Sequence, residues 1–220
     1  MPTIIFDLDD TLCNTWEASR RANLKLIPYF LRKRKFKLAH GILFGGKPEI
    51  LNDEKLLPLE AFDFIKILLG LYEDDVEDSF VREIETRFNR EFYQHLRLFE
   101  DVEEILGKLK EKGFFLSLVT DGGSKTQRKK LEFLGIKDYF DRIIISGEVG
   151  TPKTNPKNFE LAKIKGKTFV VGDRIKTDIK SGKLIGATTI LVANGPFNIG
   201  REETKPDFVI ENLRELVEIV

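Results

Sequence analysis

Short apolar runs alternate with helical segments along most of the chain, and this alternation limits the folds open to it. Six runs have the length and composition of buried strands: residues 3–8, 114–119, 142–145, 168–171, 188–192 and 208–210. Strands and helices that follow one another in this way favour a parallel sheet with right-handed crossovers. We therefore expect an α/β fold with a Rossmann-like parallel sheet as its core.

The helices between these runs carry start and stop signals. Ser124 and Gln127 have the spacing of a capping box ahead of a helix over 125–134, which Gly135 would end. Asn155 precedes a first-turn proline at the start of a helix over 156–163, and Thr177 precedes one over 178–185. We expect the side chains of Ser124 and Thr177 to cap these helices.

The stretch from about residue 14 to residue 95 shows helical patterns only, over 15–30, 59–69 and 73–92. Loops that carry Pro28, Gly41, the 45–48 turn and Pro58 are expected to separate these helices. We expect an inserted all-helical subdomain over 14–96, and a core domain formed by 1–13 and 97–220.

Composition bounds the classes of partner. The 36 basic and 36 acidic residues cancel, so net charge indicates neither nucleic acid nor an acidic membrane surface. The basic run at 32–35 is short and lacks interleaved aromatics, and we interpret it as a solvated helix face. No apolar stretch reaches 18 residues, charged residues come too early for a signal peptide, and one cysteine allows no internal disulfide. We expect a cytoplasmic protein, and the scarcity of Gln, Cys and Met suggests heat adaptation.

Polar residues follow four of the expected strands at the point where each one ends. They are Asp7 and Asp9; Thr120, Asp121 and Gly122; Lys153; and Asp173. Each residue type is common in turns and helix caps, but ligands of parallel α/β sheets bind at the carboxyl ends of the strands. Four strand ends that carry acids, a hydroxyl and a cation together predict a functional site.

The chemistry of this set is consistent with phosphoryl transfer. Asp7 and Asp9 lie two residues apart and so project to one side of extended backbone, where Asp173 adds a third carboxylate. A divalent cation offsets their repulsion, and oxygen ligands favour Mg²⁺. A carboxylate also acts as a nucleophile that forms an aspartyl-phosphate. The Thr120 hydroxyl, the Lys153 ammonium and backbone N–H groups at Asp121 and Gly122 are candidate donors to a phosphoryl group.

The segments IIFDLDDTL, LVTDGG, GTPKTNP and VVGDRIKTDI resemble, in order, the four motifs of the haloacid dehalogenase superfamily. The similarity continues through most of the chain outside the helical insert. The resemblance implies that Asp7 is the nucleophile, and that Asp9 protonates the leaving group and then activates water. It implies that Thr120 and Lys153 hold the phosphoryl oxygens.

The same resemblance assigns the metal ligands and the insert. Asp7, the Asp9 carbonyl and Asp173 would bind Mg²⁺, and Asp178 would hold a metal-bound water or position its neighbours. Asp178 is also explained as an acid in the first turn of a helix. The helical insert corresponds to a cap that closes over the site. Asp121 departs from the family, where Asn is common, and adds a negative side chain near the phosphate site.

Several functions share these motifs. The presence of Asp9 favours a Mg²⁺-dependent phosphatase over the superfamily's metal-independent dehalogenases, which lack this acid. A phosphomutase like β-phosphoglucomutase differs in releasing no phosphate. A phospho-accepting signalling module places its acids in another order, and an inactive binding protein would lack motif residues. We expect a small phosphorylated metabolite as substrate, with Lys47 of the insert as a contact to it; the sequence indicates neither its identity nor an oligomeric state.

Overall fold

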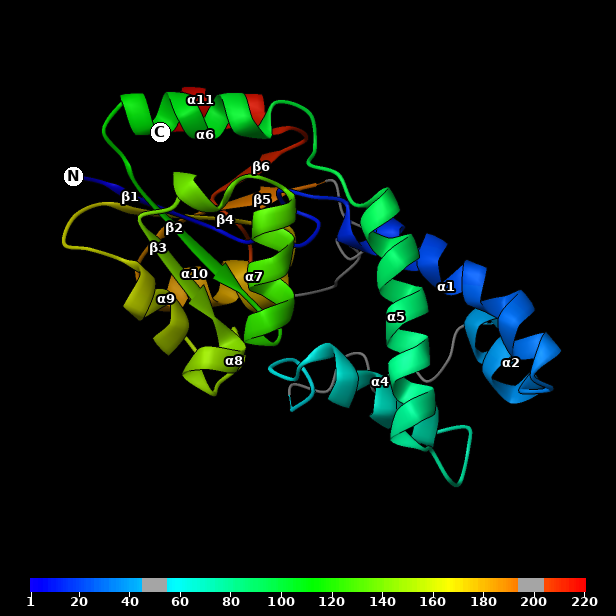
Figure 1. Cartoon of the computed structure of the whole chain (residues 1–220). Helices are drawn as coiled ribbons and strands as arrows, with labels where there is room; N and C mark the ends of the chain where they lie inside the picture. The colour runs from blue at the N-terminus through cyan, green and yellow to red at the C-terminus, as the bar shows by residue number, and fades with distance from the viewer. Residues whose placement is uncertain (45–54, 194–203) are drawn as a thin grey trace.

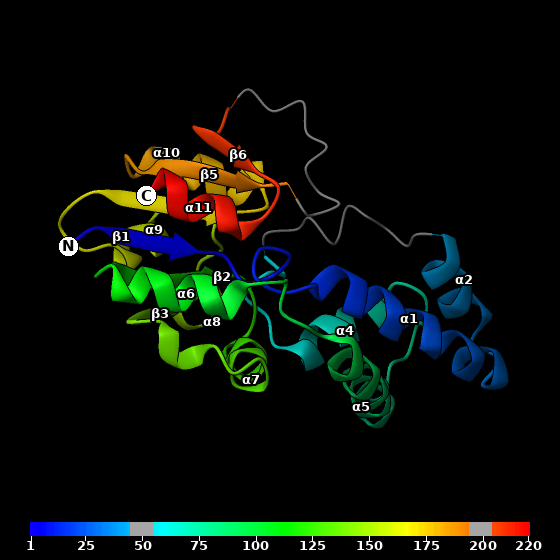
Figure 2. The ribbon, with the colours of Figure 1, turned by 90° about the horizontal axis from the view of Figure 1, so that it is seen from above.

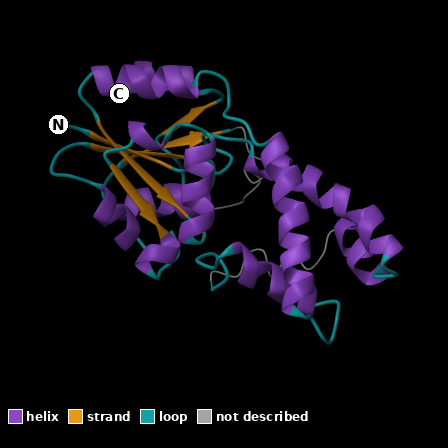
Figure 3. Cartoon of the chain, viewed as in Figure 1, coloured by secondary structure: helices purple, strands orange, loops and turns teal. Residues whose placement is uncertain are grey.

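The computed structural model describes residues 1–44, 55–193 and 204–220. The strands lie together in one lobe, and the described part of the other lobe is helical (Figures 1 and 3). One parallel sheet has the strand order β3-β2-β1-β4-β5-β6. Its strands are β1 (Thr3–Phe6), β2 (Phe115–Thr120), β3 (Arg142–Ile145), β4 (Thr168–Gly172), β5 (Thr188–Val192) and β6 (Phe208–Ile210). The predicted α/β fold with a parallel sheet is confirmed.

The first strand lies in the middle of the sheet, between β2 and β4. Phe6 at its end is in register with Leu118 of β2 and Val171 of β4. The three strands therefore end at one edge of the sheet. This register brings Asp7, Thr120 and Asp173 together although they lie far apart in the sequence.

The two faces of the sheet are covered by different helices (Figure 2). Ile4 and Phe6 are fully buried and pack on the face that α6 (Val102–Glu111) and α11 (Leu216–Ile219) cover. Ile5 points to the opposite face and packs against α9 (Lys157–Ala162). This alternation is the period of two that an extended backbone imposes, and burial on both faces explains the continuous apolar run of β1.

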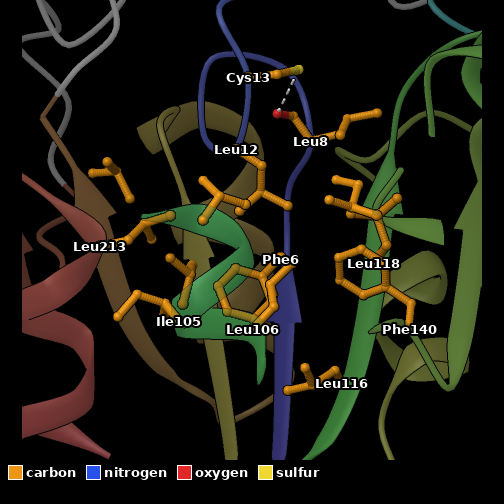
Figure 4. Packing of buried hydrophobic residues seen from close by; sticks show 14 of the residues in the cluster. Phe6, Leu8, Leu12, Cys13, Ile105, Leu106, Leu116, Leu118, Phe140 and Leu213 are labelled. Carbon is orange, nitrogen blue, oxygen red and sulfur yellow. Dashed lines mark hydrogen bonds between the residues drawn. The ribbon is translucent and has the colours of Figure 1, made fainter. Parts of the chain in front are cut away.

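The chain turns sharply after β1, and apolar side chains hold the turn in place (Figure 4). Leu8 and Leu12 are fully buried in the core, and the Cys13 thiol donates to the Leu8 carbonyl at 3.5 Å. Asp10 adopts a left-handed conformation with φ of 62°, and its carboxylate accepts the backbone N–H of Trp16 at 2.8 Å. Asp10 thus shapes the turn that follows Asp7 and Asp9.

The helical lobe has its own apolar core, to which Leu26, Phe30 and Val81 contribute. Its helices are α1 (Thr15–Arg32), α2 (Phe36–Phe44), α4 (Ala61–Gly70) and α5 (Asp78–His95). Pro28 and Gly41 were expected in loops, but they lie inside α1 and α2. Leu26 and Phe30 are buried on either side of Pro28, so packing overrides its preference to end a helix.

Two antiparallel connections join the lobes. Cys13 pairs with Leu98, and the Asn14 side chain bonds both sides of the crossing: it donates to the His95 carbonyl at 3.2 Å and accepts the Arg97 N–H at 2.7 Å. The predicted domain division after residues 13 and 96 falls at this crossing and stays a prediction.

Two helix starts differ from the sequence prediction. The helix α7 (Ser124–Phe133) begins at Ser124, whose hydroxyl bonds Glu148 instead of capping the helix. Thr177 lies within a π-helical turn (Ile175–Ile179) that runs into α10 (Lys180–Leu184), and its hydroxyl caps nothing. The remaining short helices are η1 (Lys137–Tyr139), α8 (Ser146–Val149) and η3 (Leu213–Glu215). Within the described ranges, no helix has the length and apolar character needed to cross a bilayer.

Candidate active site

A buried lysine joins two acids at the carboxyl edge of the sheet. The Lys153 ammonium lies 2.5 Å from a carboxylate oxygen of Asp7 and 2.5 Å from one of Asp178. Burial alone would lower the pKa of Lys153, but the charges of Asp178 and Asp7 raise it above its usual value. The ammonium therefore stays charged and fixes one oxygen of Asp7.

The other oxygen of Asp7 accepts the Thr11 hydroxyl at 3.0 Å. Burial raises the pKa of Asp7 to about 7, and Asp178 and Asp9 add to this effect while Lys153 opposes it. The Thr11 hydroxyl and the Lys153 ammonium thus orient the carboxylate. Because Asp7 is only 6% exposed, the carboxylate is also shielded from bulk water.

The loop that carries Lys153 is held from both sides. The Asp121 carboxylate accepts the backbone N–H of Lys153 at 2.9 Å, and the Ser181 hydroxyl donates to its carbonyl at 2.8 Å. Burial raises the pKa of Asp121. The additional acid at position 121 thus has a role in the fold, because it fixes the position of the site lysine.

Asp7, Asp173 and Asp178 form a cluster in which one carboxylate oxygen of each lies within 4.8 Å of the others. Both oxygens of Asp173 are buried and have no hydrogen-bond partner. Burial raises the pKa of Asp173 to about 9, and the charges of Asp7 and Asp178 contribute. Gly172 leaves room for this arrangement, since a Cβ there would collide with the Asp178 side chain. A cluster of three carboxylates, in which the Asp173 oxygens accept no hydrogen bond, fits a hard cation such as Mg²⁺.

The predicted phosphate-binding residues differ in what they offer. The Thr120 hydroxyl is fully buried without a hydrogen-bond partner. The backbone N–H of Gly122 is engaged, because it donates to the Ser146 hydroxyl at 2.9 Å. Lys47 lies outside the described residues.

Asp9 lies apart from the acid cluster and has its own set of donors. One of its oxygens accepts the Thr15 hydroxyl and lies 2.5 Å from the Lys130 ammonium, and the other accepts the Gln127 amide at 2.9 Å. Burial would raise the pKa of Asp9, but Lys130 and the three hydrogen bonds outweigh it and lower the pKa. In this arrangement Asp9 is an ionised carboxylate.

Besides Lys153, which the sequence predicted as a site residue, four side chains contact Asp7 or Asp9 directly: Thr11, Thr15, Gln127 and Lys130. None of these four was predicted as a site residue, and Gln127 was expected only in a capping box. The available signal was the three-residue spacing of Gln127 and Lys130, which places both on one face of the helix that follows Thr120. That helix face points towards the site.

A parallel α/β sheet carries a buried lysine and a cluster of acids at its carboxyl edge, where α/β proteins bind their ligands. The sequence profile of the haloacid dehalogenase-like hydrolases matches residues 4–192, and the chain belongs to this family.

Curated relatives match over nearly their whole length. A glyceraldehyde 3-phosphate phosphatase of Methanocaldococcus jannaschii is 32% identical, with 99% of this chain and 96% of the relative covered. The human N-acylneuraminate-9-phosphatase is 28% identical, with 97% and 91% covered. The crystal structure of a HAD phosphatase from Thermococcus onnurineus superposes with a TM-score of 0.72 at 26% identity, covering 100% of this chain and 97% of that one. The prediction of a phosphatase-type hydrolase of this superfamily is confirmed.

Proposed function

We propose that the protein is a Mg²⁺-dependent phosphatase that hydrolyses a small phosphomonoester through an aspartyl-phosphate on Asp7. The observation that carries this proposal is that an oriented carboxylate lies beside buried polar atoms that have no hydrogen-bond partner. Thr11 and Lys153 orient Asp7, while the Thr120 hydroxyl and the Asp173 carboxylate have no hydrogen-bond partner within the described chain, and Arg174 lies 3.9 Å from one oxygen of Asp173.

In the first step an oxygen of Asp7 attacks the phosphorus atom. A P–O bond to Asp7 forms, the P–O bond of the ester breaks, and the leaving oxygen takes a proton from Asp9. In the second step water attacks the phosphorus of the aspartyl-phosphate and gives a proton to Asp9, so that a P–O bond to the water oxygen forms and the P–O bond to Asp7 breaks. Phosphate leaves, and both acids return to their starting states.

The two steps require different forms of Asp9. The ionised form, held by Lys130 and Gln127, is the one that accepts a proton from water in the second step. Delivery of a proton in the first step requires Asp9 to carry one, which it donates to the leaving oxygen.

The phosphoryl oxygens would be held by the Thr120 hydroxyl and the Lys153 ammonium, together with the N–H of Asp121. Gly122 contributes less directly, through its bond to Ser146. Such donors stabilise the charge of the transferred group in a site from which water is excluded.

The carboxylates of Asp7 and Asp173 and the backbone carbonyl of Asp9 would hold Mg²⁺, with Asp178 placing a bound water. When bound, the cation offsets the negative charge that the phosphoryl group and the acids bring together. The Asp173 oxygens support this assignment, because they are buried and accept no hydrogen bond within the described chain.

The substrate class follows from the relatives. The names of the two curated phosphatases specify glyceraldehyde 3-phosphate and the 9-phosphate of an N-acylneuraminate. We propose a small phosphorylated metabolite for this chain as well, selected by the helical lobe in its role as a cap. A cytoplasmic location and Lys47 as a substrate contact remain predictions from the sequence.

The test is a panel of phosphorylated metabolites assayed for released phosphate with Mg²⁺. The wild type should release phosphate from at least one of them, and Asp7→Asn and addition of a chelator should each abolish release. Asp75→Asn, an exposed acid of the helical lobe, is the matched control and should keep full activity. Full hydrolysis by Asp7→Asn would exclude the proposed mechanism, and turnover without phosphate release would indicate a mutase instead.

A further inference from the structure

The helix α7 brings two polar side chains to Asp9. Gln127 and Lys130 are one helical turn apart and only 2% and 4% exposed. The Lys130 ammonium lies 2.5 Å from one oxygen of Asp9, and the Gln127 amide nitrogen lies 2.9 Å from the other. Each oxygen of the carboxylate thus has its own donor on the same rigid element.

The surroundings are built to allow these contacts. The Gln127 amide nitrogen also donates to the Asp121 carbonyl, so two acceptors fix which way the amide points. Gly122 has φ of 138°, and a Cβ there would lie 2.7 Å from the Gln127 amide nitrogen. The close approach of Gln127 to the site therefore requires glycine at position 122.

A buried lysine is costly in a fold unless an acid pairs with it. Lys130 pairs with Asp9. The Asp9 side chain is 23% exposed, so Asp9 is the member of the pair that solvent can reach. Lys130 is far less exposed than Asp9, so it reaches the reacting groups only through Asp9. This geometry is that of a residue, Lys130, that positions another residue, Asp9, and does not itself contact substrate.

We propose that Lys130 and Gln127 are positioning residues for Asp9, which hold its carboxylate at a fixed place and angle for proton transfer. The inference rests on the proposed function, in which Asp9 is the acid and base. A misplaced catalytic group lowers the rate of the chemical steps and leaves ground-state binding unaffected. Loss of Lys130 should therefore lower kcat and leave KM nearly unchanged.

The experiment is a double-mutant cycle between Lys130→Met and Asp9→Asn. Methionine keeps the apolar stem of lysine and removes the charge. Steady-state kcat and KM are measured with p-nitrophenyl phosphate, whose good leaving group keeps the Asp9→Asn rate measurable. Lys129→Met is the matched control, since Lys129 is the exposed neighbour on the same helix.

We expect Lys130→Met to lower kcat about 10²-fold in the Asp9 background and less than about 2-fold in the Asp9→Asn background. Lys130→Arg should recover part of the rate, Gln127→Leu should show the same dependence on Asp9, and Lys129→Met should be unchanged. Equal losses in both backgrounds, or no loss at all, overturn the proposal. If Lys130→Met alone does not fold, as judged by circular dichroism, Gln127→Leu takes its place in the cycle.

A second measurement does not depend on activity. Crystal structures of wild type and Lys130→Met show directly where the Asp9 carboxylate lies. A rotated or disordered Asp9 side chain in the variant supports the positioning role, and an unmoved one overturns it. If the wild type hydrolyses no phosphomonoester, the proposed function fails, and this structural comparison still decides whether Lys130 positions Asp9.

Discussion

At the scale of single residues, the site contains buried polar atoms that have no hydrogen-bond partner within the described chain. The Thr120 hydroxyl is the clearest test, because valine has its shape without the hydroxyl. Thr120→Val should lower kcat/KM for a phosphomonoester by about 10-fold or more while the unfolding free energy stays the same or rises by up to about 1 kcal/mol. Enzyme kinetics and urea unfolding measure the two effects.

Ser117→Ala on the same strand is the control with the opposite expectation. The Ser117 hydroxyl is buried and donates to the Ala162 carbonyl at 2.6 Å. Its loss leaves that carbonyl unpaired, so stability should fall by about 1–2 kcal/mol with little change in kcat/KM. If Thr120→Val instead destabilises the protein and retains activity, the Thr120 hydroxyl has a structural role.

We predict that binding of the proposed cation depends on pH through the Asp173 carboxyl. Its pKa is raised to about 9 in the folded chain, so its contribution to stability is present at low pH and is lost as the pH rises towards 9. A bound cation displaces the proton, so Mg²⁺ affinity should increase from pH 6 to pH 9, by at most about tenfold per unit for one proton. Calorimetry in buffers of different ionisation enthalpy measures the released proton.

The same linkage predicts a thermal effect. Added Mg²⁺ should raise Tm more at pH 8 than at pH 6, and Asp173→Asn should remove the difference. A Tm increase that does not depend on pH would argue against Asp173 as a cation ligand.

The sequence predicted the acids and Lys153 beside Asp7, but not the side chains that hold Asp9. Apolar runs define where the strands end, so Asp7, Thr120 and Asp173 could be assigned to one edge of the sheet. Whether Gln127 faces Asp9 or its own helix terminus depends on the rotation of α7, which tertiary packing decides. The capping-box spacing therefore led to a wrong prediction for Ser124, although the helix itself was predicted correctly.

At the scale of elements, the start of α7 is capped by a residue from the other lobe. Glu60 accepts the backbone N–H of Lys125 at 2.9 Å and that of Thr126 at 3.3 Å. Gly123 and Gly147 allow this contact: a Cβ on Gly123 would collide with Glu60, and one on Gly147 would lie 2.8 Å from the Pro58 carbonyl. No local sequence pattern indicates a cap that comes from 65 residues earlier in the chain.

Glu60→Ala should lower the unfolding free energy by about 1 kcal/mol, because it leaves the first amides of α7 without their carboxylate partner. Glu77→Ala is the matched control: Glu77 precedes α5 as Glu60 precedes α4, but its carboxylate bonds only the nearby Ser79 hydroxyl among the contacts described. The control should change stability by less than about 0.5 kcal/mol. Urea unfolding followed by circular dichroism measures both, and equal losses would show that the Glu60 contact stabilises nothing.

At the scale of the whole molecule, the alternation of strands and helices was sufficient to predict a parallel sheet with helical crossovers. The strand order, with β1 between β2 and β4, was not predicted and comes from the structure. The helical lobe was less predictable. Its helices depend on contacts with each other. Pro28 lies inside α1, and Gly41 packs so closely on Tyr72 that a Cβ at position 41 would lie 2.8 Å from the Tyr72 ring. Helix propensity alone places breaks at both residues.

The helical lobe begins beside Asp9. Thr15 at the first residue of α1 bonds the Asp9 carboxylate, and Glu60 contacts α7, which holds the same carboxylate. The two lobes thus meet at the residue to which we assign proton transfer, as expected of a cap that excludes water during the reaction.

The most direct test of the proposed mechanism is to trap the phosphoryl group on Asp7. Enzyme mixed with substrate and Mg²⁺ is quenched during turnover and treated with borohydride, which reduces an aspartyl-phosphate to homoserine. We predict homoserine at position 7 by peptide mass spectrometry, present only with substrate and absent in Asp7→Asn. Rapid phosphate release with an unmodified Asp7 at every time point would contradict the account.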